Sequence, residues 1–115
     1  MNPEIKIPDL FTAKKILAVQ PHYDDNDISV GGTLHLLAQE GAELHYLTVT
    51  DDLAGVIPQE DGAMLSEEEA LTLLQKNQDQ AARIIGVQNQ IRLGFPDAGD
   101  YDYFQLRKQI IDHIR

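Results

Sequence analysis

Three short apolar runs alternate with three segments of helical spacing, and this alternation most limits what the 115-residue chain can fold into. The runs cover residues 16–19, 44–50 and 91–93, and after each one apolar residues recur every three or four positions. A strand–helix repeat of this kind is typical of α/β proteins, in which right-handed crossover helices join parallel strands. We therefore predict an α/β fold with a mostly parallel sheet.

Turn and capping residues give the approximate limits of the predicted helices. Gly41 ends the first helix, and Ser66 with Glu69 forms a capping-box pattern at the start of the second, which runs to Gly86. The last helix is expected over residues 103–115. The first apolar run has no polar interruption, which predicts a strand that is buried on both faces.

Composition excludes several classes of function. The chain has no cysteine, so disulfide scaffolds, zinc knuckles and thiol catalysis are excluded. Its 19 acidic and 9 basic residues give a formal net charge of −10, which argues against binding to nucleic acids or to anionic membrane surfaces. No apolar run approaches the ~20 residues of a membrane span, and residues 1–15 do not resemble a secretory signal. A cytoplasmic location is therefore expected.

Polar residues collect where the predicted strands end. The three loops begin at His22, Asp51 and Gly94, and the carboxyl ends of parallel strands are where such sheets carry their functional sites. The first loop is the richest, because residues 22–27 hold one histidine and three aspartates.

The composition of this first loop suits a divalent cation. An imidazole with a carboxylate favours Zn²⁺ or Fe²⁺, whereas carboxylates alone favour Mg²⁺ or Ca²⁺. A carboxylate that does not bind the metal can serve as a general base. The alternative is a solvated acidic loop that caps the next helix.

The same loop resembles a known family motif. Residues 21–27, Pro-His-Tyr-Asp-Asp-Asn-Asp, and the later Gly-Gly-Thr-Leu of residues 31–34 are similar to the P-H-P-D-D-E…G-G-T-L motif. This motif opens the LmbE-like, or PIG-L, family of metal-dependent N-acetylglucosaminyl deacetylases. Weaker similarities follow in the family's order at residues 47–51, 76–79, 81–87 and 93–97.

The resemblance implies a Rossmann-like three-layer sandwich and an assignment of site residues. His22 and Asp25 would bind Zn²⁺, with Fe²⁺ or another divalent metal as alternatives, and Asp24 would accept a proton from the attacking water. Asp97 and Lys76 would contact the substrate, a small N-acylated amino sugar that is hydrolysed to acetate and a free amine. Lys76 stands where the family has arginine, which removes the two-pronged guanidinium contact.

The resemblance also implies a domain division. Residues 1–14 would be an N-terminal extension, and residues 15–115 would be the N-terminal half of the deacetylase domain, cut after the third strand–helix unit. The family's second half supplies a third metal ligand, so a complementing C-terminal fragment or a homo-oligomer is the expected protein partner. In the family the first strand is central, and without the second half residues 16–19 would form an exposed apolar edge.

Other interpretations remain open. The chain could be a non-catalytic or incomplete metal- or sugar-binding module of the same fold. A phospho-receiver domain also has an acidic pair after its first strand, but it needs a lysine after a fifth strand. A dinucleotide-binding domain needs G-x-G-x-x-G spacing, which this sequence lacks. The remaining histidines, His35, His45 and His113, are expected at the surface or in packing roles.

Overall fold

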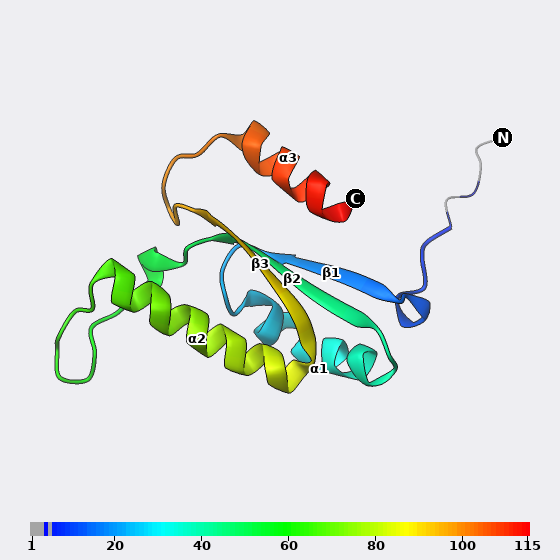
Figure 1. The fold of residues 1–115 in the computed structure, drawn as a ribbon, viewed down its shortest axis with the longest axis horizontal. Coiled ribbons are helices and arrows are strands. Elements are labelled where there is room, and N and C mark those ends of the chain that lie inside the picture. Colours follow the sequence, from blue (N-terminus) through cyan, green and yellow to red (C-terminus); the bar gives the residue numbers. More distant parts are fainter. Residues whose placement is uncertain (1–3, 5) are drawn as a thin grey trace.

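The computed structural model describes Glu4 and residues 6–115, which form a three-layer α/β unit (Figure 1). Part of the predicted 1–14 extension, residues 1–3 and 5, lies outside the described residues. Short 3-10 turns occupy Leu10–Thr12 and Leu53–Gly55. The strands and helices follow in the order β1 (Lys15–Gln20), α1 (Asp25–Gln39), β2 (Glu43–Thr50), α2 (Glu67–Ile85), β3 (Val87–Phe95) and α3 (Tyr103–Ile114).

The sheet is parallel, with strand order β1-β2-β3. Helices α1 and α2 lie on one side of the sheet and α3 lies on the other (Figure 1), which confirms the predicted α/β sandwich. Within the described residues β1 pairs only with β2, so its outer edge is free, as expected for a partial sheet. The prediction that this strand is buried on both faces is wrong: Val19 is 44% exposed, because it lies on the face of β1 opposite to Ile16 and Ala18, which pack against the core.

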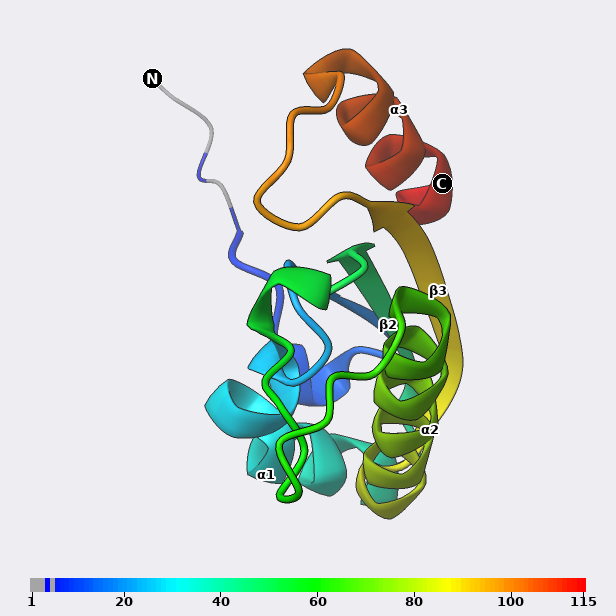
Figure 2. The same cartoon turned by 90° about the vertical axis from the view of Figure 1, so that its left-hand side faces the viewer.

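The core lies between β2 and the two helices α1 and α2. Leu44 and Tyr46 of β2 are almost fully buried, and they pack with Leu34 and Leu37 of α1 and Ile85 of α2. Burial of each large apolar side chain contributes about 1.5–3 kcal/mol, so this cluster fixes both helices against the sheet. The loops that follow β1 and β2 lead into α1 and α2, whereas the loop that follows β3 leads to α3 (Figure 2).

Glycines end the first two helices in the left-handed conformation, as the sequence predicts. Gly41 has φ +97°, and the flanking bonds from Gly41 N–H to Ala38 O and from Ala42 N–H to Leu37 O form a Schellman motif. Gly86 has φ +103° and donates its N–H to Ala82 O.

The start of α2 and the extent of β3 differ from the predictions in detail. Ser66 is the N-cap and accepts the Glu69 N–H, but the Glu69 carboxylate accepts from the Ser66 hydroxyl instead of the backbone. Strand β3 begins at Val87, four residues before the predicted apolar run 91–93, and continues to Phe95. Its first half is polar and partly exposed, so it lacks the apolar run that marks a buried strand.

No helix within Glu4 and residues 6–115 is both long and apolar enough to cross a membrane.

Candidate functional site

Three loops meet at the carboxyl edge of the sheet. Backbone hydrogen bonds hold them together, from Thr50 N–H to Pro21 O at 3.0 Å and from Asp51 N–H to Phe95 O at 2.9 Å. Because the strands are parallel and adjacent, residues that are far apart in the sequence become neighbours here. One ligand atom from each of three residues, His22, Asp52 and Asp97, lies within 4.8 Å of the others.

The His22 imidazole lies between two carboxylates. Its Nε2 is 3.0 Å from Asp97 Oδ1, and its Nδ1 is 3.3 Å from Asp25 Oδ2. An ionised carboxylate can only accept hydrogen bonds, and of the two contacts only that between Nε2 and Asp97 has hydrogen-bond geometry, so the proton of a neutral His22 is assigned to Nε2. Nδ1 then keeps its lone pair and faces Asp25.

The surrounding charges favour the protonated imidazole. Partial burial by itself would lower the pKa of His22, but the hydrogen bond to Asp97 and the negative charges of Asp97, Asp25 and Asp52 outweigh it, so the pKa rises above 6.5. A divalent cation would relieve the same concentration of negative charge.

The distance between His22 and Asp25 fits a shared metal ion. Two ligand atoms that are each 2.0–2.1 Å from a tetrahedral zinc ion lie about 3.3 Å apart, which matches the His22 Nδ1 to Asp25 Oδ2 distance of 3.3 Å. The Asp25 carboxylate is already oriented, because its Oδ2 accepts the His22 N–H at 2.9 Å. The residues present therefore fit the predicted metal.

Asp97 is held by the two other loops. Its Oδ2 accepts the Ala54 N–H at 3.1 Å, and its own N–H donates to Asp51 Oδ1 at 3.2 Å. Since Oδ1 faces His22, both oxygens of the Asp97 carboxylate have partners within the protein.

Asp52 is a site residue that the sequence reasoning did not assign. It has φ +59°, a left-handed conformation that is uncommon outside glycine and that clusters at functional sites. Burial raises the pKa of the Asp52 carboxyl, helped by the charges of Asp24 and Asp97, while a hydrogen bond from the Tyr23 backbone and the His22 charge oppose the rise. The one sequence feature that could have indicated Asp52 as a site residue is its position just after the second strand.

Asp24 faces an open cleft of about 410 Å³. It is the N-cap residue of α1, its side chain makes no capping hydrogen bond, and it is exposed. An exposed carboxylate beside His22 and Asp52 can accept a proton from a molecule in the cleft. The cleft is lined by His22, Asp24, Asp52, Gly55, Leu74 and Asp97.

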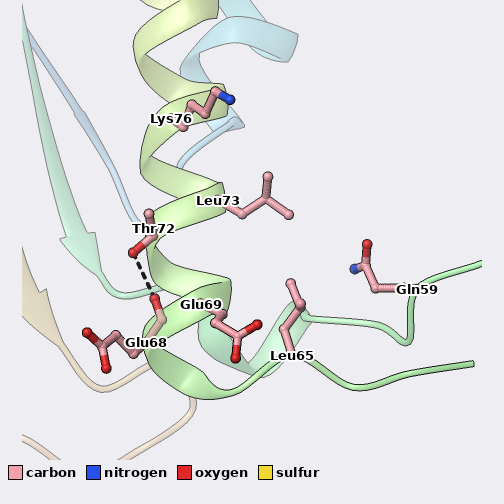
Figure 3. Close-up of a pocket in the computed structure, with 7 residues that line it drawn as sticks. All are labelled: Gln59, Leu65, Glu68, Glu69, Thr72, Leu73 and Lys76. Carbon is pink, nitrogen blue, oxygen red and sulfur yellow. Dashed lines mark hydrogen bonds between the residues drawn. The ribbon is translucent and has the colours of Figure 1, made fainter.

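Lys76, the other predicted substrate contact, lies elsewhere. Figure 3 shows it beside Leu73 on a different side of α2, where a separate hollow of about 440 Å³ opens toward the loop that carries Gln59 and Leu65. The α2 residue that lines the His22 cleft is Leu74. The structure therefore brings together His22, Asp24, Asp25 and Asp97 but not Lys76, whose substrate contact stays a prediction.

The other histidines lie away from the cleft. His35 Nδ1 is 3.1 Å from Ile85 O, and His45 Nε2 is 2.8 Å from Glu43 Oε1. His113 lines a hollow with Lys15 and Glu43, the first residues of β1 and β2, and therefore sits at the opposite end of the strands. Within the described residues, His22 is thus the sole histidine at the carboxyl edge.

A buried polar network lies beneath the site, and no sequence pattern marked it. Gln20 and Gln78 both donate to Thr48 Oγ1 at 3.0 Å. Gln78 Oε1 accepts from Arg92 Nε at 2.8 Å, and the Arg92 guanidinium lies 5.7 Å from the centre of the Tyr23 ring. This network joins β1, β2, α2 and β3 directly under the first loop.

Comparisons with known proteins agree on one family. Residues 17–115 match the PIG-L family, described as GlcNAc-PI de-N-acetylase. The diacetylchitobiose deacetylase of Thermococcus kodakarensis is 34% identical over 113 residues, covering 97% of this chain and 41% of that protein.

Solved structures show the same fold. The N,N'-diacetylchitobiose deacetylase of Pyrococcus horikoshii, complexed with its inhibitor MPG, has a TM-score of 0.81 and 31% identity, covering 90% of this chain and 38% of that one. The conserved protein TT1542 of Thermus thermophilus has a TM-score of 0.65 and 28% identity over 85% of this chain and 39% of its own. The 4-carboxy-2-hydroxymuconate hydratase GalB of Pseudomonas putida, at 18% identity and a TM-score of 0.72 over 86% of this chain and 41% of its own, shares the fold alone.

The chain spans well under half of these relatives, between 38% and 41% of their lengths.

Proposed function

Since the chain belongs to the PIG-L family of GlcNAc-PI de-N-acetylases, we propose that residues 15–115 form the N-terminal half of a metal-dependent N-deacetylase. The proposed reaction is hydrolysis of the acetamide of a glucosamine-type sugar to acetate and a free amine. The names of the two archaeal deacetylases support this substrate class. The single observation that carries the proposal is the His22 imidazole held between Asp25 and Asp97 at the carboxyl edge.

The proposed metal ligands are His22, through Nδ1, and Asp25. Metal-binding histidines commonly donate their other ring N–H to a carboxylate, which fixes the ring and raises its basicity. Asp97, 3.0 Å from His22 Nε2, is placed to accept that proton. Zn²⁺, or Fe²⁺ or another divalent metal, would polarise the amide carbonyl and acidify a water molecule when bound.

An alternative metal position uses His22 Nε2 with Asp52 and Asp97, whose ligand atoms gather within 4.8 Å. The first position uses Nδ1 of the His22 ring, and the second uses Nε2. The substitutions Asp25→Ala and Asp52→Ala therefore distinguish the two, because each removes a ligand from one position alone.

Asp24 is the proposed general base. Its carboxylate is exposed in the cleft and has no capping bond to α1, so it can take the proton of the attacking water. The water oxygen adds to the acetyl carbon, the C–N bond of the resulting tetrahedral intermediate breaks, and the nitrogen takes the proton held by Asp24 to leave as the amine. Asp97 also lines the cleft and is the proposed contact to the sugar. Its carboxylate already has two partners, the His22 ring and the Ala54 N–H, so a sugar hydroxyl would be a third.

The test compares zinc binding and hydrolysis of N,N'-diacetylchitobiose for the wild-type chain and single variants. Asp24→Ala should keep zinc and lose hydrolysis, whereas Asp25→Ala should lose both. If the 115-residue chain is inert, the same pair is measured after fusion to the remaining segment of the Thermococcus relative. Zinc affinity that Asp25→Ala leaves unchanged would reject the proposed ligand set.

A second candidate is a non-catalytic or incomplete metal- or sugar-binding module. It is favoured by the finding that His22 is the sole histidine at the carboxyl edge within the described residues. The missing ligand would then come from a complementing C-terminal fragment or from a second copy of the chain. Light scattering and zinc titration, with and without such a fragment, separate these cases. A complementing fragment should restore tight zinc binding without self-association of the chain, whereas a second copy should restore it only through self-association.

A further inference from the structure

Helix α1 starts at the candidate site without using the carboxylates of its own first turn as caps. Asp24 holds the N-cap position, yet its side chain makes no capping hydrogen bond. Asp25 Oδ2 accepts the His22 N–H at 2.9 Å, and Asp27 Oδ1 accepts the Tyr46 hydroxyl at 2.8 Å. An N-cap aspartate ordinarily accepts the N–H of the second or third helical residue, so α1 needs another acceptor.

Gln20 supplies that acceptor from the last position of β1. Its Oε1 accepts the Asn26 N–H at 2.8 Å, and Asn26 is the second residue of α1. Its Nε2 donates to Thr48 Oγ1 at 3.0 Å, and the side chain is only 1% exposed. The amide oxygen of Gln20 is thereby fixed on α1, and its amide nitrogen is fixed on the central strand β2.

We propose that Gln20 is a positioning residue that caps α1 in place of Asp24 and so keeps the Asp24 carboxylate free to face the cleft. A capping Asp24 would turn toward its own helix and away from His22 and Asp52. The inference rests on the proposed function only where it gives Asp24 the role of base.

The chemistry of the glutamine suits this position. Residues 24–27 already place three carboxylates in one turn, and Asp52 lies across the cleft. A neutral amide satisfies the helix N–H without adding another negative charge, and its N–H₂ group anchors it to Thr48. A carboxylate in the same buried place would carry a desolvation cost and repel its neighbours.

A double-mutant cycle on the 115-residue chain tests the proposal by urea unfolding. Gln20→Met keeps the length of the side chain but removes the acceptor, so Asp24 is expected to take over the Asn26 N–H. Asp24→Ala should then lower the folding equilibrium constant about fivefold more in the Gln20→Met background than in the wild type. Equal effects of Asp24→Ala in both backgrounds would overturn the proposal.

Gln78→Met is the matched control. It removes a second buried amide that also donates to Thr48 Oγ1 at 3.0 Å, but Gln78 makes no hydrogen bond to Asn26. Asp24→Ala should therefore have the same effect with Gln78→Met as in the wild type. An equally enlarged effect in this background would show a general loss of packing and count against a specific cap.

A second measurement uses the wild-type protein alone, so it still tests the proposal if the Gln20→Met chain does not fold. Scalar coupling across the hydrogen bond should connect the Asn26 amide nitrogen to the side-chain carbonyl carbon of Gln20 in the wild-type protein. Coupling to the Asp24 carboxyl carbon instead would overturn the proposal. Neither measurement depends on zinc or on hydrolysis, so a failed proposed function and a failed capping role give different results.

Discussion

His22 Nε2 lies 3.0 Å from Asp97 Oδ1, and this contact joins the first and third loops across 75 positions of sequence. Asp97 is rigidly held, because its other oxygen accepts the Ala54 N–H and its backbone donates to Asp51. The imidazole is therefore oriented before any ligand arrives, with Nδ1 turned toward Asp25. Such orientation is what a metal-binding histidine requires of its surroundings.

Asp97→Asn should lower the pKa of His22 in the metal-free protein. The substitution keeps the shape of the side chain but removes the charge and the charge-assisted bond that raise the pKa above 6.5. Burial, which lowers the pKa of His22, is then opposed only by the charges of Asp25 and Asp52. NMR titration of the His22 ring protons measures the change, with His45 as an internal reference far from the substitution. An unchanged His22 titration would show that Asp97 does not control the ring.

The stability of the metal-free protein should depend on pH through His22. Since the folded pKa of His22 is raised above 6.5, its contribution is fully present below pH 6.5 and is lost as pH rises through the folded pKa. The side chain is 39% exposed, so screening keeps the contribution below about 1 kcal/mol.

Urea unfolding of the wild type and of Asp97→Asn at about pH 5.5 and about pH 8.5 isolates this term. The stability advantage of the wild type over Asp97→Asn should be larger at the lower pH. A stability advantage of the wild type that grows with pH would contradict the predicted direction of the His22 contribution.

Tyr46→Phe should destabilise the fold by about 0.5–1.5 kcal/mol, the net worth of a typical hydrogen bond. Tyr46 is fully buried, and its hydroxyl donates to Asp27 Oδ1 at 2.8 Å. The pKa of Asp27 should rise further in the variant, because burial and the Asp24 charge raise it and the Tyr46 bond is what opposes them. Urea unfolding and carboxyl NMR measure the two effects. A variant as stable as the wild type would show that the bond contributes nothing net.

Gly86→Ala should cost more stability than Gly41→Ala. Both glycines have positive φ, so both substitutions carry the backbone penalty of about 1 kcal/mol. A Cβ at Gly86 would also lie 2.8 Å from Ala38 Cβ, whereas a Cβ at Gly41 meets nothing within 4 Å. Thermal unfolding of the two variants gives the difference. Equal losses would mean that α1 and α2 can separate at this contact without cost.

The fold was predictable because its signals are local. The apolar run of β1, the glycine at Gly86 and the capping serine Ser66 each act within a few residues, and each prediction of an element is confirmed. The polar first half of β3 was missed because its residues are placed by pairing with β2, which no local pattern records.

The site was predictable only in part. The first loop carries His22, Asp24 and Asp25 within four positions, so their proximity follows from the sequence alone. Asp52 joins them through a left-handed backbone turn, and Gln78 enters the buried network from α2. The positions of these two residues depend on tertiary packing, which the spacing of residues in the sequence does not record.

Parallel strands also set the order in which the site can come into existence. Each strand pair needs a full crossover to close, and loop closure of this kind is slow and entropically costly. The pairing of His22 with Asp97 requires β3 to be docked on β2, so the contact between Asp97 and the imidazole forms only after β3 is in place. Full metal affinity in a refolding experiment should therefore appear only once β3 has docked on β2, after the first loop has formed.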